Sequence, residues 1–138
     1  MEHIVQAPNN NPKLLSPLTL AFIGDGVYEL LVRERLVAGG SMPVGKLHSL
    51  AVQQVRASCQ SKAYFIIENQ LTEEELSVMK RGRNASGVHP PKNSDPAEYR
   101  RATGLEALFG FLYLKGEISR LNSLFDFIQE NLKQAEGV

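Results

Sequence analysis

The sequence has few of the residues that several classes of protein depend on. Its 138 residues include one cysteine, Cys59, and three histidines far apart, His3, His48 and His89. A single cysteine excludes a disulfide within the chain and suits a reducing compartment. The scattered histidines form no Cys/His cluster of the kind that binds zinc. We expect Cys59 to be a buried small hydrophobic residue.

Long apolar runs and an excess of charge of either sign are also missing. No stretch approaches the roughly 20 apolar residues of a membrane span, and the polar segment 1–13 lacks the apolar core of a signal peptide. We therefore expect a cytoplasmic protein with no membrane contact. Lys and Arg number 15, as do Asp and Glu. Binding of nucleic acid would therefore have to depend on a local basic patch.

The apolar residues that are present predict one helical domain. Hydrophobic residues make up 43% of the chain, and many recur at helical spacing. We expect a flexible segment at 1–15 and a single all-α domain of five to seven helices at 16–138. The expected elements are helices at 18–37, at 41–67 with a break near Ser58, after Thr72, from Asp95 to Gly116 and at 117–134, with an irregular segment at 81–94.

The segment 22–29 is unusual for a helix that serves packing alone. Gly24 and Gly26 each cost roughly 1 kcal/mol relative to alanine inside a helix, and Asp25 stands between them. The two glycines would let another helix or a ligand approach closely. Asp25 and Glu29 are four residues apart, so their carboxylates share one helix face. Spacing alone favours a close helix crossing with a solvated acid over a ligand site.

A second acid, Glu106, is embedded in the apolar run 103–110. A buried carboxylate is costly unless it is paired or bound to a cation. An ion pair with an arginine such as Arg33 is one solution, and a divalent cation shared with Asp25 on a facing helix is the other. Mg²⁺ binds through a few carboxylates and keeps several waters. An ion held in this way can activate water and stabilise a phosphodiester transition state.

A basic segment, 80–101, leads into the helix that carries Glu106. Its prolines and glycines predict that much of the charge lies on a loop, and irregular loops this long are usually functional. Arginine and lysine there suit contacts to phosphate. A solvated basic loop with no ligand is the plainer interpretation.

Short motifs, in this order and spacing, resemble the ribonuclease III family. Residues 20–29, LAFIGDGVYE, resemble its signature, which centres on Leu-Gly-Asp, and EALFG at 106–110 resembles its second acidic motif. The run KRGRNA at 80–85 and the turn PKN at 91–93 resemble the Mini-III group, a catalytic domain with no separate RNA-binding domain. The resemblance extends from Leu18 to about Leu124.

The resemblance implies a ribonuclease III endonuclease-domain-like helical bundle that cuts double-stranded RNA as a homodimer. Asp25 and Glu106 occupy the positions of catalytic, metal-binding acids, with Mg²⁺ as the cofactor and Mn²⁺ as a substitute. The group is associated with maturation of 23S ribosomal RNA, helped by a large-subunit ribosomal protein. The residues expected to bind RNA are Lys80, Arg81, Arg83, Asn84, Lys92, Asn93 and Arg100.

The sequence departs from larger family members at three acidic positions. Leu18, Ala21 and Thr103 stand where those members carry Glu, Glu and Asp. The number of metal ions is therefore open, and so is the role of Glu29 as an outer-shell acid.

Two other functions are consistent with parts of the sequence. A non-catalytic module for double-stranded RNA and ribosome assembly could have kept the fold and lost metal ligands. A helical DNA-binding regulator would need an exposed basic recognition helix, whereas we expect the basic residues on a loop.

Overall fold

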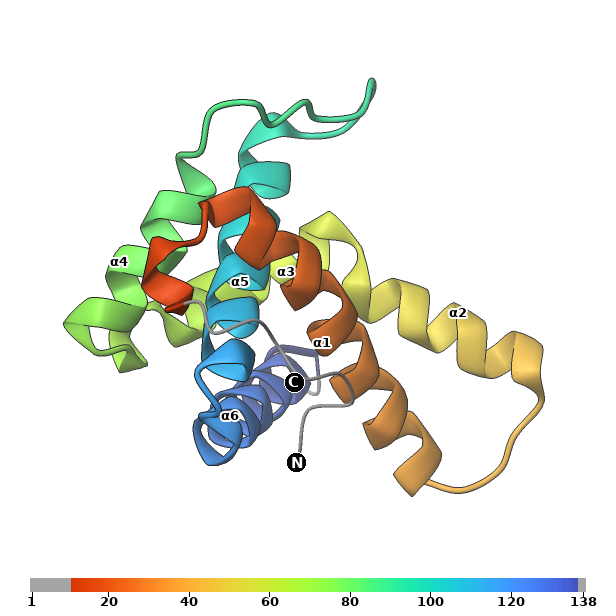
Figure 1. The fold of residues 1–138 in the computed structure, drawn as a ribbon. Coiled ribbons are helices and arrows are strands. Elements are labelled where there is room, and N and C mark those ends of the chain that lie inside the picture. The colour runs from red at the N-terminus through yellow and green to blue at the C-terminus, as the bar shows by residue number, and fades with distance from the viewer. Residues whose placement is uncertain (1–10, 137–138) are drawn as a thin grey trace.

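The computed structural model describes residues 11–136, and within that range it contains α-helices and no strand (Figure 1). This confirms the all-α class. The α-helices are α1 (Pro17–Ala38), α2 (Val44–Val55), α3 (Ala57–Ile67), α4 (Glu73–Arg83), α5 (Pro96–Leu114) and α6 (Ile118–Glu136). Residues 1–10 of the segment expected to be flexible lie outside the described range. Pro12–Leu14 forms a 3₁₀ helix, and Lys13 pairs with Glu74 at 2.5 Å.

Local capping signals set the starts of three helices, as the sequence predicts. The Ser16 side chain accepts a hydrogen bond from the Thr19 amide at the start of α1. Thr72 and Glu75 form a reciprocal capping box at the start of α4. Asp95 accepts hydrogen bonds from the first amides of α5. Each cap satisfies amides that the helix leaves unpaired, and a cap of this kind contributes about 1 kcal/mol.

The predicted break near Ser58 in the second helical region is confirmed, and it falls at Arg56. One predicted boundary is wrong. The irregular segment begins at Asn84 rather than at residue 81, because α4 continues through Arg83. Gly82 does not break α4, since it is buried against α5, where an added Cβ would come within 2.7 Å of the Ala107 Cβ. Packing between helices thus outweighs the poor helix propensity of glycine at this position.

Helix α5 is the centre of the molecule, with α1 and α4 packed against different sides of it (Figure 1). Gly110 of α5 faces the main chain of α1, where an added Cβ would lie 2.9 Å from the carbonyl carbon of Leu20. Gly104 faces α4, where it would lie 2.6 Å from the Met79 oxygen. Small residues therefore let both neighbours approach α5 at main-chain distance. Tyr28 of α1 adds edge-on ring contacts to Phe109 and Phe125, with centroids 5.1 Å and 5.5 Å away.

Helix α2 is the exception to this close packing. It extends away from the other helices (Figure 1), and Ala51 is its only buried residue. Helix α6, which the sequence predicts at 117–134, in contrast buries the apolar residues Leu121, Leu124, Phe125 and Ile128. Among residues 11–136, no helix combines the length and the hydropathy needed to cross a membrane.

Candidate active site

A cleft of about 290 Å³ lies where the first half of α1 faces the first half of α5, beneath the loop that precedes α5. Asp25 and Glu106, the two acids singled out by sequence, both line it. They come from different helices and are brought together by the close crossing of α1 and α5. The full lining is Leu18, Ala21, Phe22, Asp25, Gly87, Val88, His89, Tyr99, Thr103 and Glu106.

The crossing is close because Gly24 has no side chain. An added Cβ at Gly24 would overlap the main-chain oxygen of Glu106 and lie 2.9 Å from the Gly110 nitrogen. The expectation that a glycine beside Asp25 permits a close approach is therefore confirmed for Gly24. No other helix of this chain approaches Gly26, where an added Cβ would meet nothing within 4 Å, so a close approach there by a ligand or a second chain stays a prediction.

The two carboxyl groups interact. Asp25 is exposed and Glu106 is half-buried. Burial, the negative charge of Asp25 and a hydrogen bond with the Asp25 carboxyl together raise the pKa of Glu106 from 4.5 to about 8. Two acids held this close in a partly dry site are costly when both are ionised. A bound divalent cation would remove that cost.

The contacts of Glu106 differ from the ion pair considered at the sequence level. Arg33 pairs with Glu29 one turn away, at 3.0 Å, so it does not neutralise Glu106. The buried Gln60 amide of α3 lies beside the Glu106 carboxyl and lowers its pKa, although Gln60 Nε2 makes no hydrogen bond of normal geometry. Glu106 therefore has a neighbouring amide and a neighbouring acid.

The donor set in the cleft fits one hard cation with few protein ligands. Leu18, Ala21 and Thr103, the positions where larger relatives carry acids, all line the cleft and supply no carboxylate. The Thr103 hydroxyl donates to the Tyr99 carbonyl within α5 at 3.0 Å. No cluster of three or more acidic, histidine or cysteine ligands occurs in the described part of the chain. An ion here would be held by Asp25 and Glu106, with water completing its coordination, as Mg²⁺ commonly is.

The predicted RNA-binding residues do not all lie on a loop, contrary to expectation. Lys80, Arg81 and Arg83 occupy the last turn of α4, and Arg100 lies on α5. Asn84 is the residue that caps α4, and Lys92 and Asn93 lie in the loop. Asn93 has φ +74°, a conformation that asparagine adopts more readily than most residues.

These residues also differ in accessibility. Lys80 and Arg81 are exposed, and no acid among the described side chains, residues 11–134, forms an ion pair with either. Arg83 is half-buried and donates to the Tyr64 hydroxyl at 2.7 Å and to the Asn84 side chain at 3.0 Å. Arg100 reaches back to the Ala85 carbonyl at 3.4 Å. Lys80 and Arg81 are therefore available to a ligand, whereas Arg83 also connects α4 to α3.

Sequence reasoning missed Phe22, Tyr99 and Gln60 as neighbours of the acids. Phe22 precedes Asp25 within the signature motif, and Tyr99 stands four and seven residues before Thr103 and Glu106, on the same helix face. This spacing could have placed Tyr99 in the cleft. Nothing in the sequence could have placed Gln60, because it comes from a separate helix.

Comparisons with known proteins show the family to which the chain belongs. The ribonuclease III domain family matches residues 18–117. A protein named Mini-ribonuclease 3 from Symbiobacterium thermophilum is 47% identical over 86% of this chain and 95% of its own length. A protein of the same name from Staphylococcus aureus is 38% identical over 87% of this chain and 91% of its own length. A crystal structure of a Fusobacterium nucleatum protein superposes with a TM-score of 0.78 at 29% identity, covering 89% of this chain and 98% of that one.

Proposed function

This chain belongs to the ribonuclease III family of endoribonucleases, in its Mini-III group, and we propose that it cuts double-stranded RNA with the help of Mg²⁺. The observation that carries the proposal is the meeting of Asp25 and Glu106 in one cleft. The two acids belong to the two motifs that resemble those of the family.

Asp25 and Glu106 would hold the cation, with Mn²⁺ as a substitute for Mg²⁺. When bound, such an ion activates water and stabilises the charge that develops on a phosphodiester. The exposed Asp25 carboxyl faces the solvent from which the RNA arrives. Glu106 must lose its proton to become a ligand, and the pKa of about 8 makes this loss dependent on pH.

The surface around α4 and the following loop would bind the RNA backbone. An A-form duplex is recognised by shape, through phosphates and 2′-hydroxyls across its minor groove. The exposed cations Lys80, Arg81 and Lys92 suit such contacts. Because net charge is zero, affinity should depend on these local contacts and fall as salt increases.

An exposed apolar stripe on α1 supports a homodimer. Phe22, Leu30 and Val37 follow one another at intervals of eight and seven residues, which places them on one side of the helix. Phe22 is 84% exposed, although a side chain of that size is usually covered. A second copy of the chain would cover this stripe.

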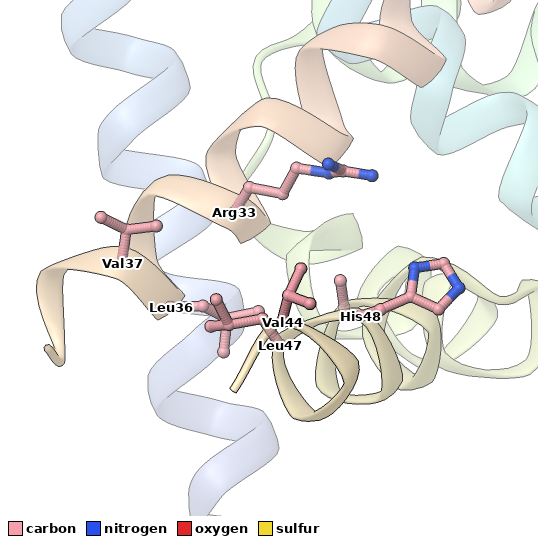
Figure 2. Close-up of a pocket in the computed structure, with 7 residues that line it drawn as sticks. Arg33, Leu36, Val37, Val44, Leu47 and His48 are labelled. Carbon is pink, nitrogen blue, oxygen red and sulfur yellow. The ribbon is translucent and has the colours of Figure 1, made fainter. Parts of the chain in front are cut away.

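An apolar groove continues this surface between α1 and α2. Figure 2 shows Leu36, Val44 and Leu47 together where the end of α1 faces the start of α2, with the polar ends of Arg33 and His48 turned away. Val44 is 82% exposed there. Helix α2 has one buried residue, so a partner that packs on this groove would stabilise it.

The biological substrate that we propose is the precursor of 23S ribosomal RNA. This assignment, the cytoplasmic location and help from a large-subunit ribosomal protein follow from the resemblance to Mini-III. Cleavage of a precursor fragment that contains the paired ends of the 23S RNA tests the substrate directly.

The test of activity compares three substrates with and without Mg²⁺: a long RNA duplex, single-stranded RNA and a DNA duplex. We expect cutting of the RNA duplex alone, only with the metal, and none by the Asp25→Asn protein. Cutting that continues in excess chelator would contradict the role of the metal.

A second candidate is a non-catalytic module that binds double-stranded RNA during ribosome assembly. It is favoured by the lining of the cleft, where Leu18, Ala21 and Thr103 leave two acids. It predicts that the protein binds the RNA duplex but does not cut it with Mg²⁺ or Mn²⁺. The nuclease proposal predicts cutting under the same conditions.

A further inference from the structure

A second hollow, of about 360 Å³, lies where the ends of α2 and α6 meet the start of α3. It shares no lining residue with the cleft that holds Asp25 and Glu106. We call it the basic hollow, and it is lined by Arg35, Leu50, Gln53, Gln54, Arg56, Ser58, Cys59, Lys62, Gln129, Leu132 and Lys133.

The charge of the basic hollow is of one sign. Four of its lining residues are cations and none is an acid. Arg35 is paired with Asp126, which lies outside the lining. Arg56, Lys62 and Lys133 are exposed, and none of them is ion-paired to an acid within residues 11–134, the range whose side chains are described. Cations gathered in a concave surface repel one another and concentrate anions.

The polar groups of the hollow are partly fixed in place. Gln129 of α6 donates to the Gln54 side chain of α2 at 2.8 Å, which joins two of its walls. At the third wall, no side chain caps the first turn of α3, and Arg56 is the residue at its N-cap. The N-terminus of a helix favours a negative charge, which adds to the effect of the three cations.

We propose that the basic hollow binds a phosphate group. Phosphate matches the set of donors because it is multiply charged and accepts hydrogen bonds from arginine, lysine and hydroxyl groups together. The group could belong to an RNA backbone or to a free phosphorylated molecule. Binding of an RNA backbone rests on the function proposed above, whereas binding of a free phosphorylated molecule does not.

The surroundings favour the RNA backbone. Lys62 and Phe65 are three residues apart on the exposed side of α3, and the Arg101 guanidinium lies 4.7 Å from the centre of the Phe65 ring. Arg83 of α4 bonds to the hydroxyl of Tyr64, the residue of α3 that precedes Phe65. Cations therefore continue from the hollow along α3 to the end of α4, the surface that we propose binds the RNA.

The test uses a triple variant, Arg56→Gln, Lys62→Gln and Lys133→Gln. Its control, Lys13→Gln, Lys46→Gln and Lys115→Gln, removes the same charge from elsewhere on the surface. Affinity for a short RNA duplex is measured in chelator, which prevents cutting, over a range of salt concentrations. Inorganic phosphate is titrated separately into both variants and the unaltered protein, with the NMR signals of the Ser58 and Cys59 amides as the readout.

For the RNA backbone we expect the hollow variant, and not the control, to lose affinity at least about fivefold. The slope of its log affinity against log salt should become shallower by about 1, since each lost phosphate contact contributes roughly 0.9. For a free ligand we expect saturable phosphate shifts at Ser58 and Cys59 that the hollow variant lacks, with duplex affinity unchanged. Either result supports the phosphate site.

The proposal is overturned if neither measurement separates the hollow variant from the control, whether both are unchanged or both weaken equally. A protein that binds no RNA duplex at all would instead contradict the proposed function. The phosphate titration would still decide whether the hollow is a site.

Discussion

The main chain of Gly24 in α1 lies directly against the carbonyl group of Glu106 in α5. A Cβ on Gly24 would come within 2.6 Å of the Glu106 carbonyl carbon and would overlap its oxygen. The residue beside one acid of the cleft thus touches the main chain of the other. Helix packing and the geometry of the candidate active site depend on the same contact.

Replacing Gly24 by alanine should destabilise the protein strongly. The added methyl group meets main-chain atoms that cannot rotate away, so α1 and α5 must separate. We expect a loss of at least about 2 kcal/mol in the free energy of unfolding, at the upper end for overpacking. Urea denaturation measures it.

The matched control is Gly26→Ala, two residues along the same helix. Nothing lies within 4 Å of the added methyl group, so the better helix propensity of alanine should raise stability by up to about 1 kcal/mol. A loss similar to that of Gly24→Ala would mean that something outside this chain, such as a second copy, packs closely on Gly26.

Neutralising either acid of the cleft should abolish cutting and leave the fold intact. Asp25→Asn and Glu106→Gln keep the size of each side chain and remove its charge. Activity should fall by more than about a hundredfold, since even indirect partners of metal ligands cost about 10- to 100-fold. Glu29→Gln on the same helix, which disturbs a surface ion pair with Arg33, should retain activity. Unchanged cutting by Asp25→Asn would remove Asp25 from the mechanism.

The stability of the metal-free protein should fall as pH rises. The folded state holds the proton of Glu106 up to a pKa of about 8, whereas the unfolded chain loses it near 4.5. Stability is therefore lost between these values, by at most about 1.4 kcal/mol per pH unit. Glu106→Gln should show a smaller loss over the same window when both proteins are unfolded with urea in chelator. Parallel pH profiles would show that Glu106 does not hold this proton.

Arg81 and Arg83 should behave differently when altered. Arg81 is exposed, so Arg81→Glu should weaken duplex binding, flatten its salt dependence and leave the melting temperature unchanged. Arg83 donates to the Tyr64 hydroxyl, so Arg83→Ala should also cost about 1 to 3 kcal/mol of stability, as for a hydrogen bond that involves a charged group. Melting curves and binding titrations of both variants separate the two roles. Equal stability of both variants would contradict the anchoring role of Arg83.

Polar substitution in the apolar groove should weaken self-association. Val44→Ser replaces a side chain that is 82% exposed in one copy of the chain, so the fold of that copy should tolerate it. In sedimentation experiments we expect the proposed dimer of this variant to dissociate at a higher protein concentration than the dimer of the unaltered protein. Leu14→Ser, at an equally exposed residue outside the groove and the stripe, is the control. A dimer that Val44→Ser leaves intact would place the interface elsewhere.

Much of the fold could be predicted because its signals are local. The starts of α1, α4 and α5 follow from Ser16, Thr72 and Asp95, whose side chains bond to amides within three residues. The end of α4 could not be predicted in this way. In the sequence, Gly82 predicts the end of the helix. The helix continues because Gly82 packs against Ala107 of α5, a contact that the sequence does not show.

The sequence predicts the two acids of the candidate site but not all of their surroundings. Asp25 and Glu106 stand out because an acid in an apolar helical run needs an explanation. Gln60 beside Glu106 could not be found, since it is a polar residue in a helix that carries no motif. The pairing of Arg33 was open at the sequence level, and the helix geometry resolved it in favour of Glu29.

The sequence by itself determined the helical class, the capped helix starts and the two acids, because these depend on hydrogen bonds and spacing within a few residues. The tertiary structure decided which residues meet. It placed Asp25 beside Glu106 across a glycine crossing, joined Arg83 to Tyr64 and gathered the cations of the basic hollow from α1, α2, α3 and α6. These contacts depend on how closely whole helices pack. Close packing in turn depends on helix surfaces that come from distant parts of the chain.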